Sequence, residues 1–135
     1  MTFSFGPRSI RGALALALFV VTATACGLPS GELVVYQRED PELAAASVED
    51  GVWQSAPWSE PGVEWLPYPP RATIQVEHTL GEEPRSVLVY LSFDPRGGQP
   101  AMAAGDLARI VAIDAESVSV RNETSAGFFA RIVAF

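Results

Sequence analysis

Alternating hydrophobic and polar positions mark a strand at residues 73–80 of this chain. The hydrophobic or weakly polar positions of this alternation are Ile74, Val76, His78 and Leu80. A period of two predicts a strand with one buried and one exposed face. Residues 87–93 form an apolar run on both faces, which predicts a strand that is covered on both sides and central in the fold. Because Gly81 and Pro84 lie between the two runs, we expect the strands to form a hairpin.

The same reasoning predicts further strands on both sides of this pair. The expected ranges are 33–36, a short stretch near 63–66, 108–113, 117–122 and 128–135. On the second strand of the central pair, Phe93 shares the inward face with Val87, Val89 and Leu91, and the connection at 123–127 is short enough for a hairpin. Five to seven short strands with little helix predict an all-β fold, either a small antiparallel sandwich or an open barrel.

Residues 51–70 combine all three tryptophans of the chain with five prolines. The candidate binding residues are Trp53, Trp58, Trp65 and Tyr68, together with the loop at 94–105. Flat rings offer a large contact area at low entropic cost, so this segment could bind a protein or a glycan. The alternative is that the rings close the core, because a domain of this size needs large side chains to do so.

Charge and composition narrow the possible functions. The net charge is −7, so we expect no binding to nucleic acid. The basic residues are all arginine, which we attribute to genome composition. One histidine and one cysteine cannot build a zinc site, and we expect neither a metal nor a cofactor. His78 lies near a predicted turn without a catalytic partner on its face, which favours a buried histidine bonded to the backbone.

The N-terminus has the layout of a targeting segment. Arg8 and Arg11 precede an uncharged run at 12–25, which is too short for a comfortable membrane span and predicts the helix of a signal peptide. Cys26 follows directly and, as the sole cysteine, cannot form an internal disulfide.

The sequence Ala23-Thr24-Ala25-Cys26 resembles the lipobox of bacterial lipoproteins. The resemblance covers residues 1–27 and implies that Cys26 carries palmitate-type acyl chains and becomes the first residue of the mature protein. In that family, the proteins kept at the inner membrane have Asp directly after the cysteine. This chain has Gly27 at that place, which favours the outer membrane. The implied organisation is a signal peptide at 1–25, a tether at 26–31 and one β-sandwich domain at 32–135. Ordinary secretion and an uncleaved anchor are the alternatives.

A second resemblance concerns residues 77–93, from His78-Thr79-Leu80-Gly81 through Pro84 into the apolar strand. This stretch resembles a hairpin of phage tail-fibre modules and implies at most a small β-module used for attachment.

Taken together, these features predict a non-enzymatic lipoprotein of the cell envelope, bound to a membrane through Cys26. We expect it to sit at the outer membrane or the periplasmic face and to present its sandwich to an envelope protein or a glycan. The alternative is an accessory subunit of a larger envelope or appendage assembly, joined through an unpaired sheet edge.

Overall fold

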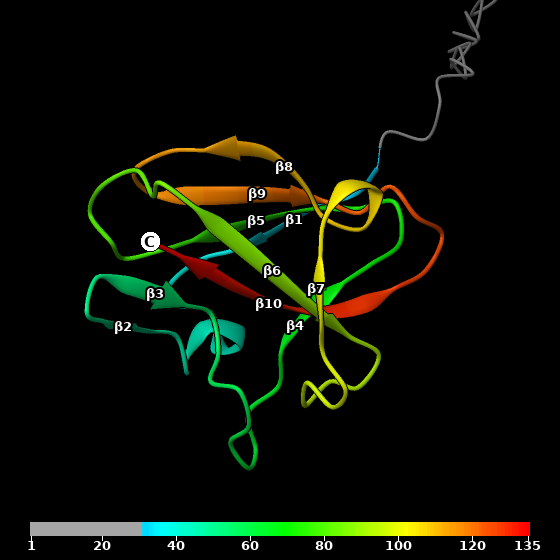
Figure 1. Ribbon diagram of the computed structural model, residues 1–135, viewed down its shortest axis with the longest axis horizontal. Helices are drawn as coiled ribbons and strands as arrows, with labels where there is room; N and C mark the ends of the chain where they lie inside the picture. The colour runs from blue at the N-terminus through cyan, green and yellow to red at the C-terminus, as the bar shows by residue number, and fades with distance from the viewer. Residues whose placement is uncertain (1–30) are drawn as a thin grey trace, which may run out of the picture.

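A computed structural model describes residues 31–135, so Cys26 and the predicted signal peptide lie outside the described residues. This part of the chain forms ten short strands and two single 3₁₀ turns (Figure 1). In chain order they are β1 (Leu33–Tyr36), η1 (Pro41–Leu43), β2 (Ser47–Glu49), β3 (Val52–Gln54), β4 (Leu66–Tyr68), β5 (Thr73–Glu77), β6 (Val87–Ser92), β7 (Ala101–Ala103), η2 (Gly105–Leu107), β8 (Arg109–Ile113), β9 (Ser117–Arg121) and β10 (Phe128–Ala134). The all-β prediction is confirmed, and the number of strands exceeds the expected five to seven because several have only three residues.

The strands form two sheets that pack face to face (Figure 1). Sheet A has the order β1-β5-β9-β8, and sheet B has the order β2-β3-β10-β6-β7, with β4 also beside β10. All pairs are antiparallel except β1 and β5, which run parallel. The fold is therefore a β-sandwich, as one of the two predicted arrangements required.

The core lies between the sheets and follows the predicted alternation. Sheet A contributes Ile74 and Val76 from β5, and Val118 and Val120 from β9, all fully buried. Sheet B contributes buried residues from β3, β4, β6 and β10, among them Trp53, Leu66, Tyr68, Val89, Leu91, Ala130 and Ile132. Among residues 31–135, the buried side chains of the core come from residues 36–134 and from both sheets.

Two predicted hairpins do not form. Strand β5 pairs with β1 and β9 in sheet A, whereas β6 pairs with β10 and β7 in sheet B. The segment 78–86 therefore crosses from one sheet to the other, and the hairpin implied by the tail-fibre resemblance is absent from residues 77–93. The connection at 123–127 likewise joins β9 to a strand of the opposite sheet, while the hairpin between β8 and β9 is present.

Strand β6 has neighbours on both sides and is therefore an interior strand of sheet B, but β10, not the predicted β6, is the central strand of that sheet. The inward residues Val89 and Leu91 of β6 are buried, but Phe93 is 77 % exposed. The prediction that Phe93 faces inward was wrong because β6 ends at Ser92 and the chain turns there. Asp94 N–H donates to Ser92 Oγ, which starts the turn.

Strand β10 is paired along one side by β6 and along the other by two short strands in succession. β4 pairs with its beginning and β3 with its end. Between them Ser55 takes the place of a strand: Ile132 N–H donates to Ser55 Oγ at 2.9 Å, and Ser55 N–H donates to Ile132 O at 2.9 Å. The chain then leaves the sheet, and residues 56–65 form an excursion loop before β4 begins.

Candidate functional site

The four rings predicted as a binding platform do not share one surface. Trp53 and Tyr68 are buried in the core between the sheets. Trp65 is also buried, with its ring under the backbone of Gly97. Trp58 alone among the four is exposed, at 48 %. The structure thus corrects the expected platform, because closing a core between such short strands uses the large rings.

Trp58 is held in place by a buried arginine on the outer side of sheet B. Arg131 of β10 is 3 % exposed, and its guanidinium carbon lies 4.0 Å from the centroid of the Trp58 ring. Its Nε donates to Ala56 O at 2.7 Å, and a terminal nitrogen donates to the side-chain oxygen of Gln54. Burial lowers the pKa of the Arg131 guanidinium. Within residues 31–135 this cation forms no ion pair, so the aromatic face and the two oxygens are what stabilise its charge.

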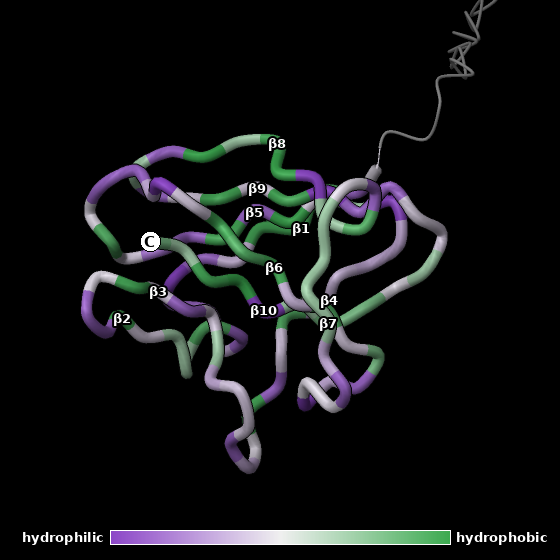
Figure 2. Tube along the Cα trace, viewed as in Figure 1, coloured by the Kyte–Doolittle hydropathy of each residue, from purple (hydrophilic) through white to green (hydrophobic). Residues whose placement is uncertain are grey.

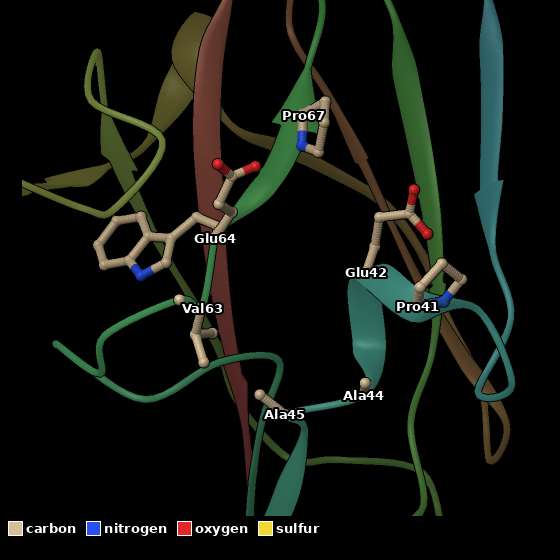
Figure 3. A pocket seen from close by; sticks show the side chains of 9 residues that line it. Pro41, Glu42, Ala44, Ala45, Val63, Glu64 and Pro67 are labelled. Atoms are coloured by element: carbon tan, nitrogen blue, oxygen red, sulfur yellow. The ribbon is translucent and has the colours of Figure 1, made fainter.

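A second feature is a groove of about 360 Å³ between η1 and the segment that leads into β4 (Figure 3). We call it the proline groove; its walls are Pro41, Glu42, Ala44 and Ala45 on one side, and Gly62, Val63, Glu64, Trp65 and Pro67 on the other. Figure 3 shows Glu42 and Glu64 on opposite walls, with Pro67 toward the same end. Ala44, Ala45 and Val63 lie toward the other end, so the groove has an acidic part and an apolar part.

Three contacts hold the walls of the proline groove in position. Leu43 of η1 is buried in the core and fixes the first wall. Trp65 N–H donates to Pro95 O at 2.7 Å and fixes the second wall. Tyr36 Oη donates to Pro67 O at 2.7 Å and joins β1 of sheet A to β4 of sheet B beside the groove. The walls of the groove are therefore held by contacts with packed elements of both sheets.

The charge of the proline groove is uncompensated. Glu42 and Glu64 are exposed, and neither forms an ion pair with another described residue. The whole chain carries a net charge of −7, which adds to the local negative potential. A basic side chain can pair with either carboxylate while its alkyl part lies on the prolines and alanines.

Sequence reasoning missed the proline groove and Arg131. The groove's walls lie about twenty residues apart in the chain, and no periodicity signals that they meet. A signal for Arg131 does exist: it is a single charge within the apolar strand Phe128–Ala134. A buried charge requires hydrogen-bond partners, and Gln54 and Ala56 provide them.

The Tyr36–Pro67 contact gives a testable pH dependence. Burial, with the nearby charges of Glu42 and Glu32, raises the pKa of Tyr36 to about 12 from 10.0. The neutral phenol therefore stabilises the fold fully below pH 10, and this contribution is lost as the pH rises toward 12. At pH 7 we expect Tyr36→Phe to lower the free energy of unfolding by about 0.5–1.5 kcal/mol, through the lost hydrogen bond.

The difference between wild type and Tyr36→Phe should shrink above pH 10, because only the wild type then loses the contribution of the neutral phenol. Urea denaturation at pH 7 and at pH 11 measures both values. A difference that does not change with pH would contradict the assignment of this titration to Tyr36.

His78 lies at the other end of β5 and is buried. Leu80 N–H donates to its Nδ1 at 3.3 Å, so its Nε2 carries the proton and donates to Asp114 O at 3.0 Å. The predicted bonding of His78 to backbone is confirmed. Asp114 in turn accepts hydrogen bonds from the backbone of Glu116 and Ser117, which lowers the pKa of its carboxyl group and closes the turn between β8 and β9.

Comparisons with known proteins identify no relative, so a function has to be inferred from the fold and from the contacts described above. No protein-family model, no curated protein and no solved structure matches the chain. Among the helical turns of residues 31–135, none has the length and hydropathy required to cross a membrane.

Proposed function

We propose that this protein is a non-enzymatic lipoprotein of the bacterial cell envelope, attached through Cys26, whose sandwich binds a basic protein partner in the proline groove. The observation that carries the binding role is the pair Glu42 and Glu64 on opposite walls of a groove of about 360 Å³, with no cation of the described chain between them. The order of Arg8, Arg11, an uncharged run and Cys26 supports the attachment.

A protein partner fits the groove better than a glycan does. A glycan site relies on exposed rings, and three of the four candidate rings are buried. A lysine or arginine side chain matches the groove because its charged end pairs with a carboxylate and its methylene groups cover apolar surface. A two- or three-chain lipid anchor at Cys26 gives stable attachment. The outer membrane and the periplasmic face are the proposed locations, because Gly27 stands where the lipoproteins kept at the inner membrane have Asp.

The absence of lysine makes this binding directly testable by cross-linking. A carbodiimide joins carboxylates to amines, and this chain has no side-chain amine with which to cross-link to itself. Carbodiimide treatment of intact membranes is therefore expected to give a product that joins this protein to an amine of its partner. Glu42→Gln/Glu64→Gln should abolish that product.

The matched control is Glu82→Gln/Glu83→Gln, which removes two exposed carboxylates from the loop between β5 and β6 and should leave the product unchanged. A product that persists in the groove variant contradicts binding at this groove. Incorporation of a palmitate analogue into wild type but not into Cys26→Ala tests the attachment separately. Unlabelled wild-type protein would remove the lipid anchor from the proposal.

A second candidate is an accessory subunit joined by strand addition at β1. Among residues 31–135 this strand is paired on one side only, and its outward residues Leu33 and Val35 are 59 % and 43 % exposed. An added strand would bond to the free backbone edge of β1 and need no groove carboxylate. A stoichiometric complex that survives Glu42→Gln/Glu64→Gln and is lost on Val35→Pro would favour this candidate, because proline removes a backbone donor.

A further inference from the structure

Exposed apolar side chains gather around a hollow of about 230 Å³ at one end of sheet B. We call this surface the end patch and define it by Phe93, Met102 and Leu107, which are 77 %, 68 % and 39 % exposed. The ring of Phe93 packs on that of Phe128, with centroids 5.0 Å apart, and both rings line the hollow with Met102 and Leu107. Contiguous apolar surface of this kind on a small domain marks a site of contact with another apolar surface.

The residues directly after Phe93 form a hydrogen-bonded turn, which holds the end patch in its exposed position. Ser92 Oγ donates to Gly98 O and accepts from Asp94 N–H, and Arg96 N–H donates to Asp94 Oδ1. These bonds close the turn directly after Phe93. The ring is therefore fixed outward before any partner arrives, and contact needs no rearrangement of the backbone.

The end patch lies at the end of the sandwich where the described chain begins (Figure 1). Leu33 of β1 is in register with Thr73, and Thr73 with Arg121 of β9. Two residues further on, Glu123 N–H donates to the carbonyl of Asp106, the neighbour of Leu107 in η2. Figure 2 shows hydrophobic stretches of β7 and of the start of β10 at this same end. A short series of contacts thus joins the start of the sandwich to the patch.

Only residues 27–30 separate Cys26 from the described chain, and an extended chain spans at most about 3.6 Å per residue. A lipid anchor at Cys26 therefore holds this end of the sandwich within about 20 Å of the bilayer. We infer that the end patch rests on the lipid surface, with Phe93, Met102 and Leu107 at the boundary between headgroups and acyl chains. This inference rests on the proposed anchoring at Cys26.

The contact with lipid is apolar, because the acidic chain is repelled by anionic headgroups. Apolar contacts of this type persist at high ionic strength, whereas electrostatic contacts weaken. Contact with a neutral bilayer in high salt is therefore part of the inference. The proline groove is lined by other residues, so it stays open to a protein partner while the end patch is covered.

The test uses residues 27–135, which contain every core residue of the described part of the chain, with a hexahistidine tag in place of residues 1–26. The tag attaches the chain to phosphatidylcholine vesicles that contain a nickel-chelating lipid, whether or not cells acylate Cys26. A nitrobenzoxadiazole label is placed at Met102→Cys, or at Val48→Cys as the matched control. Val48 is similarly apolar and exposed, but lies on β2, opposite Trp53.

On vesicles we expect the label at position 102 to emit at shorter wavelength and to lose quenching by iodide, at low and at high salt, while the label at 48 does not change. Adding Phe93→Ser and Leu107→Ser should remove the shift at 102. Three results would overturn the inference: an equal response of both labels, loss of the shift in high salt, or a shift that appears without vesicles as the protein concentration rises. The last of these would indicate that a second copy of the chain covers the patch. Palmitate labelling of the full chain decides the anchor independently of these results.

Discussion

Trp53→Ala is expected to lower the free energy of unfolding by about 3–5 kcal/mol, the usual cost of removing a large buried ring. Trp53 is 1 % exposed and lies in register with Ala134 of β10, and its ring meets that of His78 edge-on with centroids 6.2 Å apart. The loss of this ring leaves a cavity that the short strands around it cannot close. Urea denaturation followed by circular dichroism measures the change.

Trp58→Ala is the matched control for this substitution. Trp58 is half exposed and contacts the Arg131 guanidinium and the rings of Tyr90 and Trp65, whose centroids lie 4.6 Å and 6.2 Å from its own, so we expect a loss of about 0.5–2 kcal/mol. Equal losses for the two variants would show that Trp58 is as much a core residue as Trp53. In that case Trp58 would not be free to contribute a ring to a binding surface.

Gly97→Ala is the second substitution with a large expected effect. Gly97 has a φ of 76°, and a Cβ atom there would lie 2.3 Å from the Trp65 ring. The left-handed backbone costs about 1–2 kcal/mol for a residue with a side chain. Displacement of the packed ring adds about 1–3 kcal/mol. We expect a total loss of about 2–5 kcal/mol in the free energy of unfolding, measured by urea denaturation.

Gly81→Ala separates these two costs. Gly81 has a φ of 78°, almost the same as Gly97, but no atom lies within 4 Å of the position its Cβ would take. Only the backbone cost of about 1–2 kcal/mol applies at this position. If Gly97→Ala and Gly81→Ala destabilise the protein equally, the contact between Gly97 and Trp65 does not constrain the fold.

The faces of the strands could be predicted from sequence, but their partners could not. Alternation identified Ile74, Val76, Val118 and Val120 as buried, because a strand of period two with one apolar face must bury that face. Alternation carries no information about which strands are neighbours. Gly81 and Pro84 permit a reversal within one sheet and a crossing between sheets equally well, and here the chain crosses. Strands of three residues such as β3 and β7 are too short to show a period at all.

The candidate site was predicted only in part, for a physical reason that concerns the aromatic residues. A tryptophan can close a core or present a binding surface, and its surroundings in the folded chain decide between these roles. In residues 51–70 the strands β3 and β4 turn Trp53 and Tyr68 inward, while the excursion loop leaves Trp58 outside. The proline groove arises from the meeting of η1 with residues 62–67, a contact made by the tertiary fold.

The parallel pairing of β1 with β5 has a mechanical consequence. A pull on the start of β1 acts along the strand, so its hydrogen bonds to β5 are loaded together in shear and do not open one after another as they would in a hairpin. Because η1 follows β1 directly, tension between a membrane and a partner in the proline groove passes through the first strand. Because Glu64 and Pro67 belong to the other wall of the groove, part of the same tension also reaches β4 of sheet B.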